Sequence, residues 1–196
     1  MATITDIRDR LRIDLHDPDG ERWNDSALDR HIARALGDIT NAIPREASTT
    51  LATTPGSREL SLAGISGLVQ VEAVEYPVDR YPPVYVGFSH WEDTLSLHTE
   101  NEPSGGDARI FYTAAHELDG TGTTLPAHLE DVLATGAAAY AVLEQATGAT
   151  DALTTGDDVS ETFAAQGRAW MSAFRELLYH HGRRNRVRGR RLYVPA

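Results

Sequence analysis

The hydrophobic positions near the N-terminus recur three and four residues apart, which is the spacing of one helical face. This pattern predicts a helix over residues 4–15 and a second over residues 25–43. Thr3 with Asp6, and Asn24, are suited to cap the two helices, because their side-chain oxygens accept hydrogen bonds from first-turn N–H groups. A short loop containing Pro and Gly joins the helices. The pattern therefore predicts a helical hairpin whose apolar face needs a partner.

The middle of the chain, residues 48–118, has no sustained helical period. Short β-favouring runs separated by Pro and Gly turns occur there instead. Five of them are predicted as strands: Arg58–Ala63, Leu68–Tyr76, Val84–Trp91, Thr94–Thr99 and Ala108–Ala115. Their spacing predicts a small antiparallel sandwich or barrel.

Helical spacing returns after Pro126, a residue that suits the first turn of a helix. The run Gly136–Ala139 within this third helix is small enough to let another helix approach closely. A polar connector over residues 147–156 leads to a last amphipathic helix, which is expected to end near Gly182.

The predicted fold class is α+β. Residues 1–47 form an N-terminal helical hairpin, and residues 121–182 supply two C-terminal helices that complete a helical bundle. A small antiparallel β domain is inserted over residues 48–120, and residues 183–196 form an extended basic C-terminal arm. No run of about 18 apolar residues and no signal-peptide core occurs, so we expect no membrane segment and a chain that stays in the cytoplasm of the cell that makes it.

Two absences from the 196-residue composition narrow the possible chemistry. The chain contains no Cys, which excludes disulfides, thiolate nucleophiles and Cys-ligated metals. All 18 basic residues are Arg, and the lack of Lys excludes Schiff-base chemistry and a P-loop lysine.

No motif in the sequence selects a catalytic, cofactor-binding or metal-binding residue. The eight histidines include no pair four residues apart and no HExxH motif. The segment Gly120–Leu125 resembles part of a dinucleotide-binding fingerprint but lacks its third glycine, so it is interpreted as a turn. Acidic residues are plentiful, but nothing in their spacing selects a catalytic pair. We therefore expect no enzyme, no cofactor and no metal.

Charge is distributed unevenly along the chain. Residues 1–182 hold all 29 acidic residues and 12 Arg, a formal charge of −17, whereas residues 183–196 hold six Arg and no acid, a formal charge of +6. The candidate binding residues of this arm are its arginines and the apolar residues that follow: Arg183, Arg184, Arg186, Arg188, Arg190, Arg191, Leu192, Tyr193 and Val194.

Three interpretations of the arm are open. A solvated, frayed terminus is the simplest. Alternatively, the arginines pair with carboxylates of an acidic protein groove while the apolar residues fill it or add a strand to a sheet edge. Nucleic acid is the third possible ligand, but a body of charge −17 repels phosphate, so an acidic protein groove suits the arm better.

The order of elements is similar to that of the head–tail adaptor (connector) proteins of tailed phages, of the type that carries a β insert. The matching segments are Ile4–Leu11, Arg22–Asp25, Val71–Pro77 and Leu125–Asp131, followed by an alanine-rich run to Tyr140. Together these segments extend the resemblance over nearly the whole chain.

This resemblance implies a structural protein of the virion that is assembled in the host cytoplasm. Such adaptors form a ring, usually of twelve copies, docked beneath the portal protein, with the helical parts side by side. The C-terminal arm reaches the portal, and the next neck or tail protein (the stopper) docks below. Packaged DNA passes through the channel without specific binding. The alternatives are a nucleic-acid-binding module that uses the Arg-rich tail, and a hydrolase that uses acidic residues of the β insert.

Overall fold

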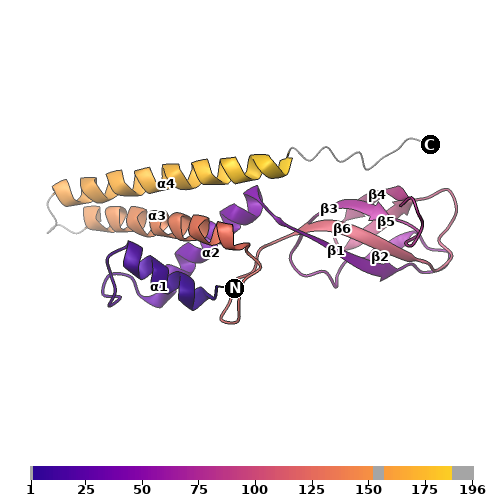
Figure 1. Ribbon diagram of the computed structural model, residues 1–196, viewed down its shortest axis with the longest axis horizontal. Coiled ribbons are helices and arrows are strands. Elements are labelled where there is room, and N and C mark those ends of the chain that lie inside the picture. The colour runs from indigo at the N-terminus through magenta and orange to yellow at the C-terminus, as the bar shows by residue number, and fades with distance from the viewer. Residues whose placement is uncertain (1, 152–156, 187–196) are drawn as a thin grey trace. The chain divides into compact units, whose positions relative to one another are not determined.

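The computed structural model of the chain describes the backbone of residues 2–151 and 157–186, and the side chains of residues 2–147 and 161–183. The described helices are α1 (Ile4–Asp14), α2 (Asp25–Ala42), α3 (Ala127–Asp151) and α4 (Asp157–Arg186) (Figure 1). The strands are β1 (Arg45–Ala52), β2 (Glu59–Ser61), β3 (Leu68–Glu75), β4 (Tyr85–Trp91), β5 (Thr94–His98) and β6 (Asp107–Ala114). The predicted α+β class, with helices at both ends of the chain and strands between them, is confirmed.

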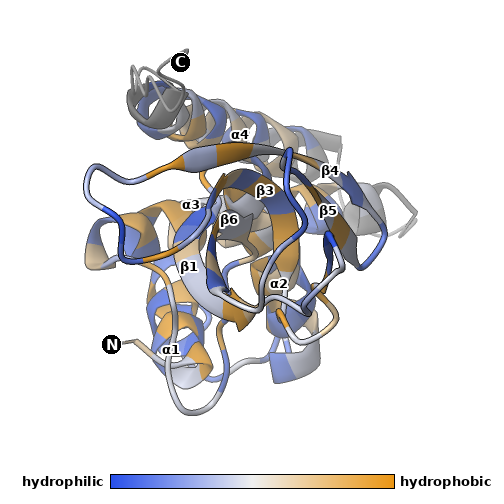
Figure 2. Cartoon of the chain, turned by 90° about the vertical axis from the view of Figure 1, so that its right-hand side faces the viewer, coloured by the Kyte–Doolittle hydropathy of each residue, from blue (hydrophilic) through white to orange (hydrophobic). Residues whose placement is uncertain are grey.

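The chain divides into two units that are each compact. The helical unit contains residues 2–43 and 116–186, and the β unit contains residues 44–115. Figure 2 shows hydrophobic and hydrophilic stretches interspersed along the visible helices and strands. Within the described residues, no helix combines the length and apolar character needed to cross a bilayer.

The first two helices begin at the caps that the sequence predicts. Thr3 and Asp6 form a reciprocal capping box on α1, and the Asn24 side chain accepts a hydrogen bond from the N–H of Ala27 at the start of α2. The loop between the helices closes around the buried carboxylate of Asp17, which accepts backbone N–H groups of residues 21–23 at 3.0–3.3 Å. Burial alone raises the pKa of Asp17, but these hydrogen bonds outweigh it and leave the pKa lowered.

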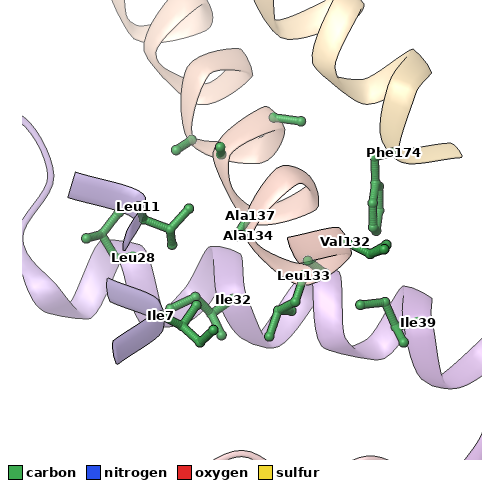
Figure 3. Close-up of a cluster of buried hydrophobic side chains, with 14 of the residues drawn as sticks. Ile7, Leu11, Leu28, Ile32, Ile39, Val132, Leu133, Ala134, Ala137 and Phe174 are labelled. Atoms are coloured by element: carbon green, nitrogen blue, oxygen red, sulfur yellow. The ribbon is translucent and has the colours of Figure 1, made fainter. Parts of the chain in front are cut away.

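Helix α3 lies at the centre of the helical unit and contacts α1, α2 and α4. Figure 3 shows Ile7 and Leu11 of α1 and Leu28 and Ile32 of α2 meeting the apolar face of α3. Five alanines of α3 are buried in this core: Ala134, Ala137, Ala138, Ala139 and Ala141. A helix that is apolar on nearly all sides is expected where other helices surround it.

Two glycines set the distance between α3 and α4. A Cβ built on Gly136 of α3 lies 2.6 Å from the ring of Phe174, and a Cβ built on Gly167 of α4 lies 2.8 Å from Leu143. Neither position has room for a larger side chain. The close helix approach that the sequence predicts at Gly136 is confirmed.

Both C-terminal helices run further than their sequence predicts. Helix α3 continues to Asp151, so the expected polar connector that begins at Thr147 is wrong in its first five residues. Helix α4 continues to Arg186, so the expected helix end at Gly182 is also wrong, and the first four residues of the predicted extended arm are helical. Arginine is a good helix former, and positive charge is favourable at a helix C-terminus because it faces the negative end of the helix dipole.

The β unit contains a strand that the sequence does not predict. Strand β1 has Arg, Glu, Ala and Ser where strands favour branched and aromatic residues, so its local preference is weak. Every residue of β1 nevertheless has a register partner on β6, from Arg45 opposite Ala114 to Ala52 opposite Asp107. The strand is therefore stabilised by its pairing with β6 and not by local propensity.

The six strands form one antiparallel sheet in the order β1-β6-β3-β4-β5-β2. Strands β3 and β4 pair over only two positions, Val74 with Val86 and Glu75 with Tyr85. Residues from both sides of this short junction share one buried cluster: Leu60, Leu62, Val71, Val74, Leu95, Leu97, Ala108 and Ile110. The sheet therefore curls so that its two halves enclose a common core.

The contact at Gly136 predicts that the variant Gly136→Ala loses stability. Alanine is the better helix former by about 1 kcal/mol, but the overpacking against Phe174 costs about 1–3 kcal/mol and should outweigh this gain. We expect a net loss of up to about 2 kcal/mol in the free energy of unfolding, measured by chemical denaturation.

The matched control is Gly37→Ala in α2. A Cβ at Gly37 has nothing within 4 Å, so this variant should gain up to about 1 kcal/mol. Equal stabilisation of both variants would contradict the close packing of α3 on α4.

Candidate interaction surfaces

A hollow of about 590 Å³ opens between α2, α3 and α4 of the helical unit. We call it the arginine hollow, because the side chains of three arginines line it. Its lining residues are Arg30, His31, Arg34, Tyr140, Leu143, Glu144, Thr147, Met171 and Arg175. Leu143 and the buried Met171 supply its apolar part.

Glu144 of α3 is the centre of an ion-pair network on one side of the arginine hollow. Both of its carboxylate oxygens lie 2.5 Å from Nη2 of Arg30. Its Oε2 also lies 2.7 Å from Nε2 of the buried His31, but this second contact is not aligned as a hydrogen bond. The hydrogen bonds from Arg30 lower the pKa of Glu144, so this carboxylate stays ionised. Burial lowers the pKa of His31 and outweighs the opposing effect of Glu144.

Tyr140, one turn before Glu144 on α3, lines the same hollow. Its hydroxyl donates to Oδ2 of Asp38 at 2.5 Å, while the guanidinium of Arg34 lies over its ring at 4.1 Å from the centroid. Burial and the adjacent Asp38 carboxylate raise the pKa of Tyr140, so its hydroxyl remains a hydrogen-bond donor. The ring therefore holds Arg34 in place without neutralising its charge.

Two arginines of the hollow lack a carboxylate partner. Among the described residues, neither Arg34 nor Arg175 forms an ion pair, whereas Arg8, Arg10 and Arg12 of α1 each do. Among the described residues the hollow thus presents two guanidinium groups without an ion-pair partner, with the Asp38 carboxylate at the hydroxyl end of the Tyr140 ring, on a chain whose net charge is −11. Guanidinium groups bind carboxylate or phosphate through two parallel hydrogen bonds, so the hollow suits an anionic group.

The first residue of the predicted arm lies at a second, smaller hollow near the end of α4. Ala42 of α2 and Leu178, Tyr179, Gly182 and Arg183 of α4 line it. Arg183 is exposed, as is the apolar ring of Tyr179. The backbone of Arg184 and Arg186 is helical. Their side chains lie outside the described residues, and so do the remaining candidates of the arm: Arg188, Arg190, Arg191, Leu192, Tyr193 and Val194.

Histidines bond to protein groups at several described positions. His116 is buried, and its Nε2 donates to the carbonyl of Ile43 at 2.9 Å. The exposed rings of His90 and His98 lie within hydrogen-bond distance of the carbonyl of Glu92 and the hydroxyl of Ser89. No group of three or more His, Asp or Glu side chains in the described ranges is placed to hold a metal ion.

The glycine pair 120 and 122 belongs to a turn, as the sequence predicts. Oδ1 of Asp119 accepts the N–H groups of Thr121 and Gly122 and the hydroxyl of Thr121, at 2.6–3.0 Å. These hydrogen bonds, that of the Thr121 side chain first, lower the pKa of Asp119. The segment is therefore a closed Asx-type turn and not a phosphate-binding loop.

In the β unit, a hollow of about 230 Å³ over β1, β6 and β3 is lined in part by Glu46 and Glu72. The two carboxylates come from β1 and β3, which lie on either side of β6. The backbones of β1 and β3 are therefore about 10 Å apart. Exposed aromatic residues, which are typical of protein interfaces, lie elsewhere in the unit. Tyr81 precedes β4 and Trp91 ends it, so the two do not form a single patch.

A comparison with protein families matches the chain along nearly its whole length. A family model described as SU10 adaptor protein matches residues 2–195. The chain therefore belongs to the SU10 adaptor protein family. A comparison with curated proteins gave no match.

Membership of this family confirms the resemblance to phage adaptors and supports the role of a phage head–tail adaptor. It favours a structural role in the virion over an enzymatic one. It also implies interaction with the portal and tail proteins of a phage.

The arginine hollow was missed by sequence reasoning. One signal was present, because Arg30 and Arg34 are four residues apart on the predicted second helix and therefore share a face. Nothing in the sequence indicates that Tyr140 and Arg175 join them, since helix packing brings these residues together.

Burial lowers the pKa of His31 in the folded protein, so the folded state favours the neutral ring. This preference stabilises the folded protein above the unfolded pKa of about 6.5, and the stabilisation is lost as the pH falls through the folded pKa. We expect the free energy of unfolding of the wild type to fall between pH 7 and pH 5 more steeply than that of His31→Gln. The difference in slope should not exceed about 1.4 kcal/mol per pH unit, the limit for one proton. His98→Gln, on an exposed ring, is the control, and parallel curves for His31→Gln and wild type would contradict the prediction.

Proposed function

We propose that this adaptor forms a ring beneath the portal and joins the capsid to the neck and tail. The helical parts, residues 1–47 and 121–182, pack side by side in the ring, and residues 48–120 form the inserted β domain. The protein acts as a structural connector without catalysis. The observation that carries the proposal is the family match over residues 2–195.

Residues 183–196 are proposed as the arm that binds the portal. Their six arginines and no acid give a concentrated positive charge, followed by the apolar group Leu192, Tyr193 and Val194. This combination fits a protein groove with acidic walls, in which guanidinium groups pair with carboxylates and apolar side chains fill the groove. Because α4 continues to Arg186, the proposed arm begins as a helix.

The acidic body suits a passage for DNA. Residues 1–182 carry a formal charge of −17, which repels a phosphate backbone. Packaged DNA therefore passes through the channel of the ring without specific binding. On the opposite side of the ring from the portal, the next neck or tail protein docks.

The arm is tested by pull-down with the portal protein encoded in the same genome. The full chain is compared with a chain that ends at Arg186, because this truncation leaves the described helix α4 intact. We expect the truncated chain to stay folded by circular dichroism and to bind the portal about tenfold more weakly or not at all.

Two matched full-length variants separate the contributions of the arm. One replaces Arg188, Arg190 and Arg191 by Gln, and the other replaces Leu192, Tyr193 and Val194 by Ala. Loss in the first alone indicates an electrostatic contact, and loss in the second alone indicates an apolar one. Portal binding by the truncated chain at full strength would show that residues 187–196 do not bind the portal and that the arm assignment is wrong for them.

The same proteins distinguish the alternative, a nucleic-acid-binding module. That function predicts an affinity for duplex DNA that falls steeply with salt and disappears on truncation. The adaptor proposal predicts no measurable DNA binding by the full chain at physiological salt.

A further inference from the structure

The outward side of α1 carries an exposed apolar residue among acidic ones. Ile13 is 72% exposed, and Asp6 and Asp9, which precede it on the same side of the helix, are exposed as well. Asp6, Asp9 and Ile13 are spaced three and four residues apart and lie along one line of the helix. We call Asp6, Asp9 and Ile13 the acidic face of α1. Asp9 forms no ion pair within the described part of the chain.

The acidic face of α1 points away from the core of its own copy. The buried residues of α1 include Ile7 and Leu11. At 100° per residue, Ile13 is 200° from Leu11 and Asp9 is 200° from Ile7. The face is therefore on the solvent side of the helix, where nothing in the described helical unit covers it.

The arginine hollow lies on the opposite flank of the helical unit. Arg10 of α1 contacts Asp131 of α3 at 2.5 Å, which places Asp131 on the side of α3 that faces α1. Tyr140, in the hollow, is nine residues further along α3, which is two and a half helical turns, so it points to the other side. The two surfaces cannot meet within one copy, but they can meet between successive copies.

The two surfaces are complementary in charge and in apolar character. The hollow offers the guanidinium groups of Arg34 and Arg175 beside Leu143 and Met171. The acidic face offers carboxylates beside Ile13. At an interface, an apolar contact gives affinity, and charges beside it that pair with opposite charges on the partner fix the register.

We propose that the acidic face of α1 of one copy docks in the arginine hollow of the next copy. This inference rests on the ring proposed above and names its subunit contact. Because the contact joins two different surfaces, it is head-to-tail, and repetition of it closes a ring when the rotation between copies permits.

The test uses two charge-reversed full-length proteins. The first carries Asp9→Arg on the acidic face, and the second carries Arg34→Glu in the hollow. Each should self-associate about tenfold more weakly than the wild type, because an attractive pair becomes repulsive. Self-association is measured by sedimentation equilibrium from micromolar to millimolar protein.

Mixing the two variants provides the decisive measurement. In an alternating assembly, the reversed face of the first protein meets the reversed hollow of the second, and the remaining contacts are wild type. We expect the equimolar mixture to recover association to within about threefold of wild type, a difference of the size that one exposed ion pair makes.

Matched controls separate this contact from net charge and folding. Arg80→Glu and Asp93→Arg change the charge equally at exposed positions elsewhere and should associate like wild type. Circular dichroism verifies that each variant is folded. A folded variant that associates like wild type overturns the contact, as does a mixture that fails to recover.

The outcome is distinguishable from failure of the proposed function. A wild-type chain that stays monomeric up to millimolar concentration overturns this contact, while arm-dependent portal binding would leave the adaptor role standing. If the full chain fails to bind the portal in the pull-down while the mixed variants behave as expected, the portal assignment is wrong and the contact between copies stands.

Discussion

The close packing of α3 against its neighbours is the constraint on which the helical unit depends. Its small residues let α1, α2 and α4 all approach the same helix, and Gly136 leaves space that the ring of Phe174 fills. Since protein interiors are packed at crystal-like density, such a contact tolerates little change in either partner. The helices around α3 therefore have little freedom to shift relative to one another.

The same packing creates the charged surface. Toward its C-terminal half, α3 changes from alanines to Tyr140 and Glu144, which are too polar to be enclosed. The arginine hollow lies beside these residues, and arginines from α2 and α4 line it. Geometry set by small residues in the core thus determines where cationic side chains gather on the surface.

The elements that depend on local chemistry could be predicted from sequence. The caps at Thr3 and Asn24, the turn at Asp119 and the close approach at Gly136 each follow from a few neighbouring residues. What could not be predicted depends on partners distant in sequence. Strand β1 is stabilised by β6, about 60 residues away, and Arg30 meets Glu144 only because α2 packs on α3. The last turn of α4 differs from the sequence prediction for another reason. Glycine commonly ends a helix, but Gly182 continues this one against Ala42.

Electrostatics makes the placement of arginine decisive for how such a chain associates. Copies with a net charge of −11 repel one another at long range, and in the proposed ring this repulsion must be offset locally. At physiological salt, charges interact over about 8 Å, so the sign of the facing groups matters more than the total charge. In α1 the arginines are already neutralised by neighbouring carboxylates, whereas Arg34 is held over a neutral ring that leaves its charge available. In the proposed contact between copies, attraction is thereby confined to a few positions, which favours one register over non-specific aggregation.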